Sequence, residues 1–268
     1  MSTKAFPVPS VYSGNLIWPL NLDTAPSLIR HWRDCLKAGV PRELYASLIL
    51  TAGPTQSSHV IVMQFSYLGT KAQGEPYLQA ISSWNGERLL LKDVEERSFL
   101  SQQDGVAQVL KGSANRRWMV RGDLIENMTD DFIYESVQRF QNIGSRTVWL
   151  FELGGGASDD NDEESSCISK LQRSARFTLG ALQQWAEQEE DIRCASSVDE
   201  WMQSCVSKVS VGGPYPCFLE RREPIERVRR TFGDATFEKL LKIKRKWDPK
   251  GMFRHTFASG LCDAANLG

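Results

Sequence analysis

The chain has 268 residues, and its 32 Lys and Arg nearly balance its 33 Asp and Glu, which leaves a formal net charge of −1. Hydrophobic residues make up 41% of the sequence and charged residues 24%, a globular composition that excludes a disordered or fibrous chain. The balanced charge argues against a nucleic-acid or membrane partner, since both would favour a basic surplus. With no repeat and no clear linker, we expect one unit over 1–268, which includes an N-terminal tail over 1–10.

The cysteines and histidines do not form a metal-binding pattern. None of the six cysteines belongs to a CxxC pair, and His31, His59 and His255 lie far apart in the sequence. The beginning of the chain lacks the apolar core of a signal peptide, and the longest apolar runs are too short to cross a bilayer. We therefore expect no metal, reduced thiols and a cytoplasmic location.

Strands and helices are interspersed in the first half of the chain. Asp23 or Thr24 is suited to cap a helix, and Pro26 suits its first turn. In chain order we predict a strand over Val11–Leu20, a helix over Ser27–Lys37, strands over Leu44–Ala52 and Val60–Leu68, and helices over Glu75–Ser83 and Ser101–Leu110.

The second half shows the same mixture without regular βαβ alternation. In chain order we predict a strand over Asn115–Asp123, a helix over Phe132–Phe140, strands over Thr147–Leu153 and Arg176–Trp185, and helices over Val198–Val206, Pro224–Phe232 and Ala235–Lys246. This order predicts an α+β fold with a mainly antiparallel sheet and helices packed on one face.

The one low-complexity segment, 154–167, is rich in glycine and acidic residues. It lacks the Gly-Lys-Ser/Thr ending of a phosphate loop, and its carboxylates would repel phosphate. We expect a flexible, solvated loop there, with a metal site as the alternative.

The stretch Arg227–Arg254 reads RVRRTFGDATFEKLLKIKRKWDPKGMFR. An aromatic-Gly-acidic segment leads into a helix with a basic face, which ends at Trp247-Asp248-Pro249 and is followed by Phe253-Arg254. This combination resembles the C-terminal signature of the berberine-bridge-enzyme-like flavin oxidases, of the vanillyl-alcohol-oxidase type. The resemblance implies that 222–256 form the C-terminal helices of that family.

Weaker likenesses extend the match toward the N-terminus. The Val11–Pro19 segment resembles the opening strand of the family's substrate domain, and Leu153-Gly154-Gly155 resembles its Leu-Gly-Gly turn. The chain therefore resembles the substrate domain alone, without the domain that holds FAD in the family. The family's Tyr-x-Asn motif beside the flavin appears here as Tyr215-Pro216-Cys217, so we expect no cofactor.

Three residues are candidates for catalysis. The resemblance implies an active-site role for Tyr215; the alternative is a half-buried tyrosine on a strand. It also implies that Arg121 lies near the flavin ring; the alternative is a solvated arginine. Arg117, Met119 and Arg121 share one face of their strand by alternation, and Trp118 shares the other with Val120. Glu152 interrupts an apolar strand, which favours a polar function in the site. The alternative is a carboxylate that simply faces outward from the strand.

Aromatic and apolar side chains of the strands predict either a ligand cavity or a homodimer interface on the sheet face that a flavin domain would cover. The alternative for each tryptophan is a place in the hydrophobic core, and the alternative for His255 is a purely structural role. The expected substrate-binding residues are Trp18, Trp118, Met119, Trp149, Phe177, Gly180 and His255.

We expect a flavin-independent enzyme of secondary metabolism that acts on a hydrophobic small molecule. The most favoured activity is a ring closure of the Diels-Alderase type, because a pocket that orients a reactive molecule accelerates cyclisation. The alternatives are one half of a FAD-linked oxidoreductase and a ligand-binding module without chemistry.

Overall fold

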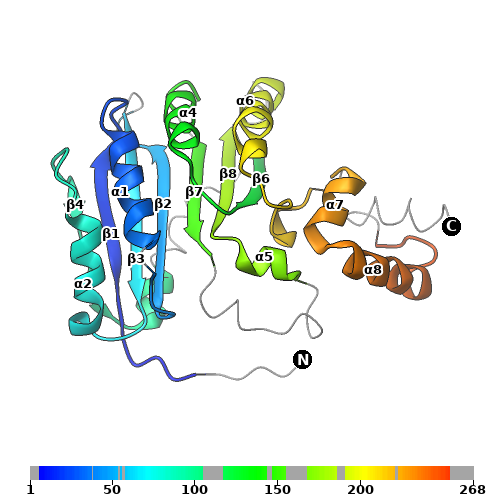
Figure 1. The fold of residues 1–268 in the computed structure, drawn as a ribbon, viewed down its shortest axis with the longest axis horizontal. Helices are drawn as coiled ribbons and strands as arrows, with labels where there is room; N and C mark the ends of the chain where they lie inside the picture. Colours follow the sequence, from blue (N-terminus) through cyan, green and yellow to red (C-terminus); the bar gives the residue numbers. More distant parts are fainter. Residues whose placement is uncertain are drawn as a thin grey trace.

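An antiparallel sheet forms the centre of the fold (Figure 1). The structure is a computed structural model that describes residues 6–37, 39–53, 55, 58–104, 117–143, 147–154, 168–185, 191–220 and 223–253. The described strands are β1 (Val11–Pro19), β2 (Leu44–Ala52), β3 (His59–Tyr67), β4 (Leu91–Lys92), β5 (Glu95–Arg97), β6 (Arg117–Ile125), β7 (Thr147–Leu153) and β8 (Phe177–Trp185). They follow the order β4-β1-β3-β2-β7-β8-β6, and β5 pairs with β1 as well.

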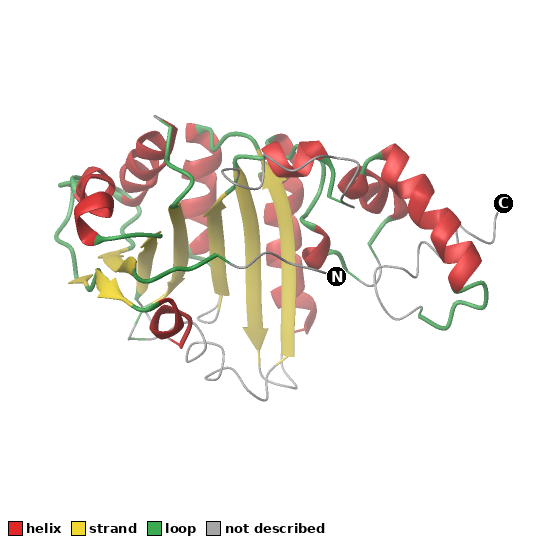
Figure 2. Ribbon diagram, turned by 90° about the horizontal axis from the view of Figure 1, so that it is seen from below, coloured by secondary structure: helices red, strands yellow, loops and turns green. Residues whose placement is uncertain are grey.

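Most of the long helices lie behind the sheet in Figure 2. The described helices are α1 (Ala25–Lys37), α2 (Lys71–Ser82), α4 (Asp130–Phe140), α5 (Lys170–Ser174), α6 (Asp191–Ser204), α7 (Ile225–Phe232) and α8 (Asp234–Trp247), with short 3-10 turns η3 (Val206–Lys208) and η4 (Pro216–Phe218). Thr129 caps α4 by accepting the N–H of Phe132 on its side chain. Asp130 and Asp131 follow in the first turn, where carboxylates complement the helix dipole.

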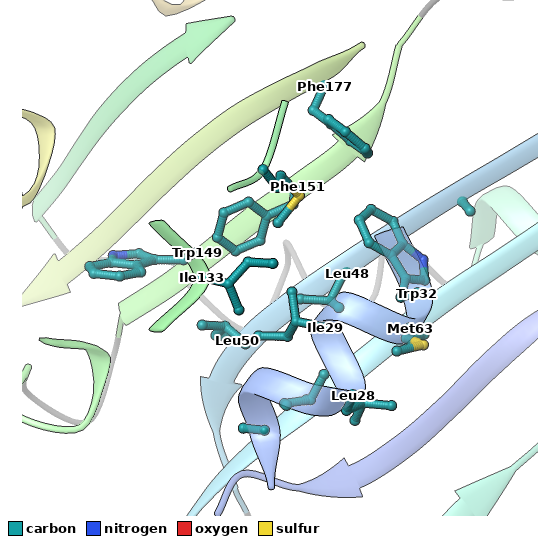
Figure 3. Close-up of a cluster of buried hydrophobic side chains, with 14 of the residues drawn as sticks. Leu28, Ile29, Trp32, Leu48, Leu50, Met63, Ile133, Trp149, Phe151 and Phe177 are labelled. Carbon is teal, nitrogen blue, oxygen red and sulfur yellow. The ribbon is translucent and has the colours of Figure 1, made fainter. Parts of the chain in front are cut away.

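The main core lies between one face of the sheet and helices α1, α4 and α6 (Figure 3). Trp149 of β7 stacks on Trp201 of α6 with ring centroids 3.8 Å apart. The ring of Trp32 in α1 lies 5.7 Å from that of Phe177 in β8. We call this side of the sheet the helix face. It carries the large apolar side chains that the sequence pattern assigns to the strands.

The opposite side of the sheet is the open face, formed by the alternate residues of each strand. Many of its side chains, such as Ile49 and Leu150, are only partly buried, whereas their neighbours Leu48, Leu50 and Phe151 on the helix face are fully buried. Solvent therefore reaches part of the open face.

Helices α7 and α8 form a hairpin beyond the edge strand β6 (Figure 1). The two helices share a small separate core of Val228, Phe232, Phe237 and Leu241. Arg227 of α7 fastens this hairpin to β6, because its guanidinium donates to the backbone carbonyl of Gly122 at 2.7 Å and to the Asp123 carboxylate at 3.0 Å.

The predicted fold class is confirmed, since the described strands pair antiparallel and the main helices cover one face. The strands Leu44–Ala52 and Thr147–Leu153 have the predicted bounds. Helix α6 begins at Asp191, earlier than the predicted Val198. Most of the acidic segment 154–167 lies outside the described residues.

Candidate functional site

A row of polar side chains crosses the open face. The strand register places Asn15 opposite Gln64, Gln64 opposite Ser47, Ser47 opposite Glu152, and Glu152 opposite Thr178. Ser47 is fully buried and donates a hydrogen bond from its hydroxyl to Oε1 of Gln64 at 3.1 Å. Five neighbouring strands thus present hydrogen-bonding groups side by side.

An apolar row runs parallel to the polar one. The register aligns Ile17, Val62, Ile49 and Leu150 across four strands, and Gly180 of β8 stands next to Leu150. A Cβ atom placed on Gly180 would meet no atom closer than 3.6 Å. The missing side chain therefore leaves a shallow recess, about the size of a methyl group, beside Leu150 and Leu182.

Gly122 lies opposite Gly180, and another side chain occupies the space that a side chain at Gly122 would need. A Cβ atom there would lie 2.8 Å from Cβ of Phe218 in η4. We expect Gly122→Ala to destabilise the fold by about 1–3 kcal/mol through overpacking, whereas Gly180→Ala should change stability by less than about 1 kcal/mol. Urea denaturation followed by circular dichroism measures both. Equal losses for the two variants would contradict this account of the recess.

Glu152 and Tyr45 form a hydrogen-bonded pair at the centre of the open face. The Tyr45 hydroxyl donates to Oε1 of Glu152 at 2.7 Å. Burial, followed by the negative charge of Glu152 and this hydrogen bond, raises the pKa of Tyr45. The hydroxyl therefore stays protonated at neutral pH and remains a donor to the carboxylate.

Turn η4 packs against β6 and brings one further polar group, the thiol of Cys217, toward this pair. Phe218 packs on Gly122, and Cys217 lies close enough to Glu152 for its charge, after burial, to raise the pKa of the thiol. Tyr215, one of the three catalytic candidates, precedes η4 and is 41% exposed. The structure thus places Cys217 and Glu152 within electrostatic range of each other.

Arg121, the third catalytic candidate, points to the helix face. Its guanidinium forms an ion pair with Asp199 of α6 at 2.9 Å and another with Glu220. These partners hold the side chain between β6, α6 and the segment before α7. The structure therefore separates Arg121 from Glu152, which lies on the open face.

The expected substrate-binding residues are divided between the two faces. Trp18, Trp149 and Phe177 are core residues of the helix face, each at most 1% exposed, and Met119 packs against the same core. On the open face lie Gly180 and Trp118, the latter 41% exposed. His255 lies outside the described residues.

The sequence reading missed Tyr45. Strand Leu44–Ala52 was predicted, and alternation alone separates Tyr45 from Leu44, Leu48 and Leu50. Its link to Glu152 depends on the pairing of β2 with β7, across 107 residues of sequence. No local pattern specifies that pairing.

The charge of the open face bears on FAD, the cofactor that the family resemblance implies. At the open-face positions of the six long described strands, Glu152 carries the only formal charge. This face fits a flat apolar ring, but its carboxylate would repel a pyrophosphate. The described open face therefore does not fit the pyrophosphate part of FAD.

Comparison with known proteins links this geometry to a family. Residues 197–258 match the family model described as "Berberine and berberine like". A FAD-linked oxidoreductase of Dictyostelium discoideum is 22% identical over 261 residues, which cover 94% of this chain and 52% of that protein.

Two solved structures have the same fold. BBE-like 1 of Physcomitrella patens superposes with a TM-score of 0.75 at 15% identity, over 91% of this chain and 52% of that one. The 6-hydroxy-D-nicotine oxidase of Arthrobacter nicotinovorans gives a TM-score of 0.76 at 14% identity, over 92% of this chain and 54% of that one. The chain thus spans about half the length of these relatives.

The fold is therefore that of one half of a FAD-linked oxidase. Residues 197–258 are similar to the berberine-like domain, and the chain shares its fold with the matching half of BBE-like proteins. None of the described helices has the length and apolar character that a membrane crossing requires.

Proposed function

We propose that this chain forms the substrate-binding part of a FAD-linked oxidoreductase and holds a small apolar molecule against its open face. The observation that carries the proposal is the match to a FAD-linked oxidoreductase along 94% of the chain. The apolar row and the Gly180 recess supply a surface for the carbon skeleton of a substrate, and the polar row supplies hydrogen bonds that orient it.

In this role the residues of the chain bind and orient the substrate. The Tyr45–Glu152 pair can accept a hydrogen bond from a substrate hydroxyl or amine, because the carboxylate has acceptor positions beyond the one that Tyr45 occupies. A flavin, held by other parts of the protein, would supply the oxidation.

A cofactor-independent ring closure is the second candidate. The Tyr45–Glu152 pair favours it, because a carboxylate that the Tyr45 hydroxyl orients stands beside an apolar row and can accept a hydrogen bond from the reacting molecule. A ring closure that isomerises its substrate needs no oxidant and changes no atom count. Orientation on such a surface contributes about 7–11 kcal/mol at best to lowering the barrier.

Methyl NMR of the purified chain tests the shared step, which is binding to the open face. We expect apolar aromatic compounds to shift the methyl signals of Ile49, Leu150 and Leu182 and to leave those of Leu48 and Leu50 on the helix face unchanged. If no compound shifts the open-face methyls, the proposal is wrong.

The mass of the product distinguishes the two candidates. The chain is incubated with phenolic and polyene compounds, with and without added FAD and its flavin-binding counterpart. A product lighter by a pair of hydrogen atoms, formed only with flavin, supports the oxidoreductase. A product of unchanged mass, formed without flavin, supports ring closure. Binding with neither product would indicate a ligand-binding module.

A further inference from the structure

Helices α1 and α2 meet at one crowded carbonyl group, that of Ala80 in the last turn of α2. Nε2 of His31 lies 2.9 Å from this oxygen, and the thiol of Cys35 donates to it at 3.5 Å. Ser83 donates to the same oxygen twice, from its hydroxyl at 2.8 Å and from its backbone N–H at 3.4 Å. A carbonyl oxygen has two lone pairs, so four donors are more than it can satisfy.

The side chains around this oxygen include two good metal ligands. His31 and Cys35 stand four residues apart on α1 and share one face of the helix, with Nε2 and Sγ 3.6 Å apart. Oγ of Ser83 lies 3.4 Å from the same nitrogen. The described residues contain no group of three His, Cys, Asp or Glu side chains suited to a metal, so the other two donors are a hydroxyl and a carbonyl.

The spacing of the four donor atoms resembles that of a tetrahedral metal site. Around Zn²⁺, with bonds of about 2.0–2.3 Å, tetrahedral donors lie about 3.3–3.6 Å apart. Nε2 to Sγ, Nε2 to Oγ and Sγ to the carbonyl oxygen measure 3.6, 3.4 and 3.5 Å. The distances from the carbonyl oxygen to Nε2 and Oγ, 2.9 and 2.8 Å, are hydrogen-bond lengths. One cation in place of the shared hydrogens would widen them by about half an ångström.

The end of α2 favours a positive charge at this point. The last carbonyls of a helix carry the negative end of its dipole, and α2 has no basic residue in its last turn. Burial, followed by the charge of the neighbouring Asp34, raises the pKa of the Cys35 thiol. The thiol is therefore protonated without a metal, and a metal that binds it releases one proton.

We propose that His31, Cys35, Ser83 and the Ala80 carbonyl bind a thiophilic divalent metal ion of the zinc type, which joins α1 to α2. The thiol proton passes to solvent, the imidazole binds through Nε2 with its proton on Nδ1, and the hydroxyl and carbonyl bind as neutral oxygen donors. Four protein donors leave no open position, so the ion is structural rather than catalytic.

This site is separate from the surface to which the proposed function refers. Leu78 and Ile81 of α2 belong to the main core with α1, on the helix face of the sheet. The metal site therefore lies on the opposite side of the sheet from the Tyr45–Glu152 pair, and neither proposal depends on the other.

Zn²⁺ titration of the metal-free chain against a chromophoric chelator measures the affinity. We expect one ion per chain, and we expect His31→Gln and Cys35→Ser each to weaken its binding at least about tenfold. His59→Gln is the matched control, because this histidine packs on the ring of Phe140, and it should leave the affinity unchanged.

Thiol labelling of the unaltered chain locates the ion. Peptide mass spectrometry follows the reaction of each cysteine with N-ethylmaleimide, with and without Zn²⁺. We expect Zn²⁺ to slow the labelling of Cys35 at least about tenfold and to leave that of the exposed Cys217 unchanged. Co²⁺ in the same site should show the strong visible bands of tetrahedral coordination and a thiolate charge-transfer band.

The inference is wrong if Zn²⁺ leaves the labelling of Cys35 unchanged, if Co²⁺ shows only the weak bands of an octahedral ion, or if His31→Gln binds Zn²⁺ as tightly as the unaltered chain. Labelling and the Co²⁺ spectrum need no variant, so they decide the question even where a substitution prevents folding. Each of these failures would leave the methyl NMR test of the open face unaffected.

Discussion

Trp201→Ala is expected to destabilise the fold by about 3–5 kcal/mol. Trp201 is fully buried where α6 meets the sheet, and its ring stacks on Trp149 and contacts those of Phe132 and Phe151. Its indole N–H also donates to the Ser136 hydroxyl in α4 at 3.0 Å. The substitution removes this aromatic cluster's central ring and leaves a cavity between α4, α6 and β7.

Trp118→Ala is the matched control, since this tryptophan is 41% exposed on the open face. We expect this substitution to lower the free energy of unfolding by less than about 1 kcal/mol. Guanidinium denaturation followed by far-ultraviolet circular dichroism compares the two variants without relying on tryptophan fluorescence. Similar losses in both would show that the aromatic cluster does not dominate the core.

Asp123→Ala is expected to lower the free energy of unfolding by about 2–4 kcal/mol. The Asp123 side chain is 2% exposed, and it accepts from Arg227, from the Ser210 hydroxyl at 2.7 Å and from the N–H of Leu124 at 2.8 Å. Without the carboxylate these donors lose their partner, although Arg227, 30% exposed, keeps some contact with water. The hairpin of α7 and α8 should loosen from β6.

Asp234→Ala tests the same kind of pair at the surface. Asp234 is 84% exposed and contacts Arg229 at 3.3 Å, so its loss should cost about 1 kcal/mol or less. Urea denaturation gives the two stabilities, and limited proteolysis within 209–224 reports whether the hairpin has loosened. An Asp123→Ala variant that is no less stable than Asp234→Ala would contradict the role given to the buried carboxylate.

The sequence predicted the elements whose pattern is local. Strands β2 and β7 have the predicted bounds because nearly continuous runs of apolar, aromatic and β-branched residues define them without reference to the rest of the fold. Strands β4 and β5 were missed, since Leu91–Lys92 and Glu95–Arg97 are too short and polar to show a pattern and become strands by pairing with β1.

The candidate site was predicted only in part, for the same reason. Glu152 stood out as a charge within an apolar strand, and it lies at the centre of the open face. Alternation grouped Arg117, Met119 and Arg121 correctly, but the face that helices cover depends on where α6 packs. Arg121 therefore pairs with Asp199 on the helix face, and Tyr45 entered the site through a pairing that spans 107 residues of sequence.

The polar row across the open face also has a consequence for how the sheet folds. Side chains alternate with a period of two, so a slip of β7 by one residue would turn Glu152 toward the helices and bring Trp149 and Phe151 to the solvent side. Neighbouring strands carry Ser47 and Gln64 at the same level, so each would suffer a similar exchange. The polar residues of the open face therefore discriminate against misregistered sheets during folding.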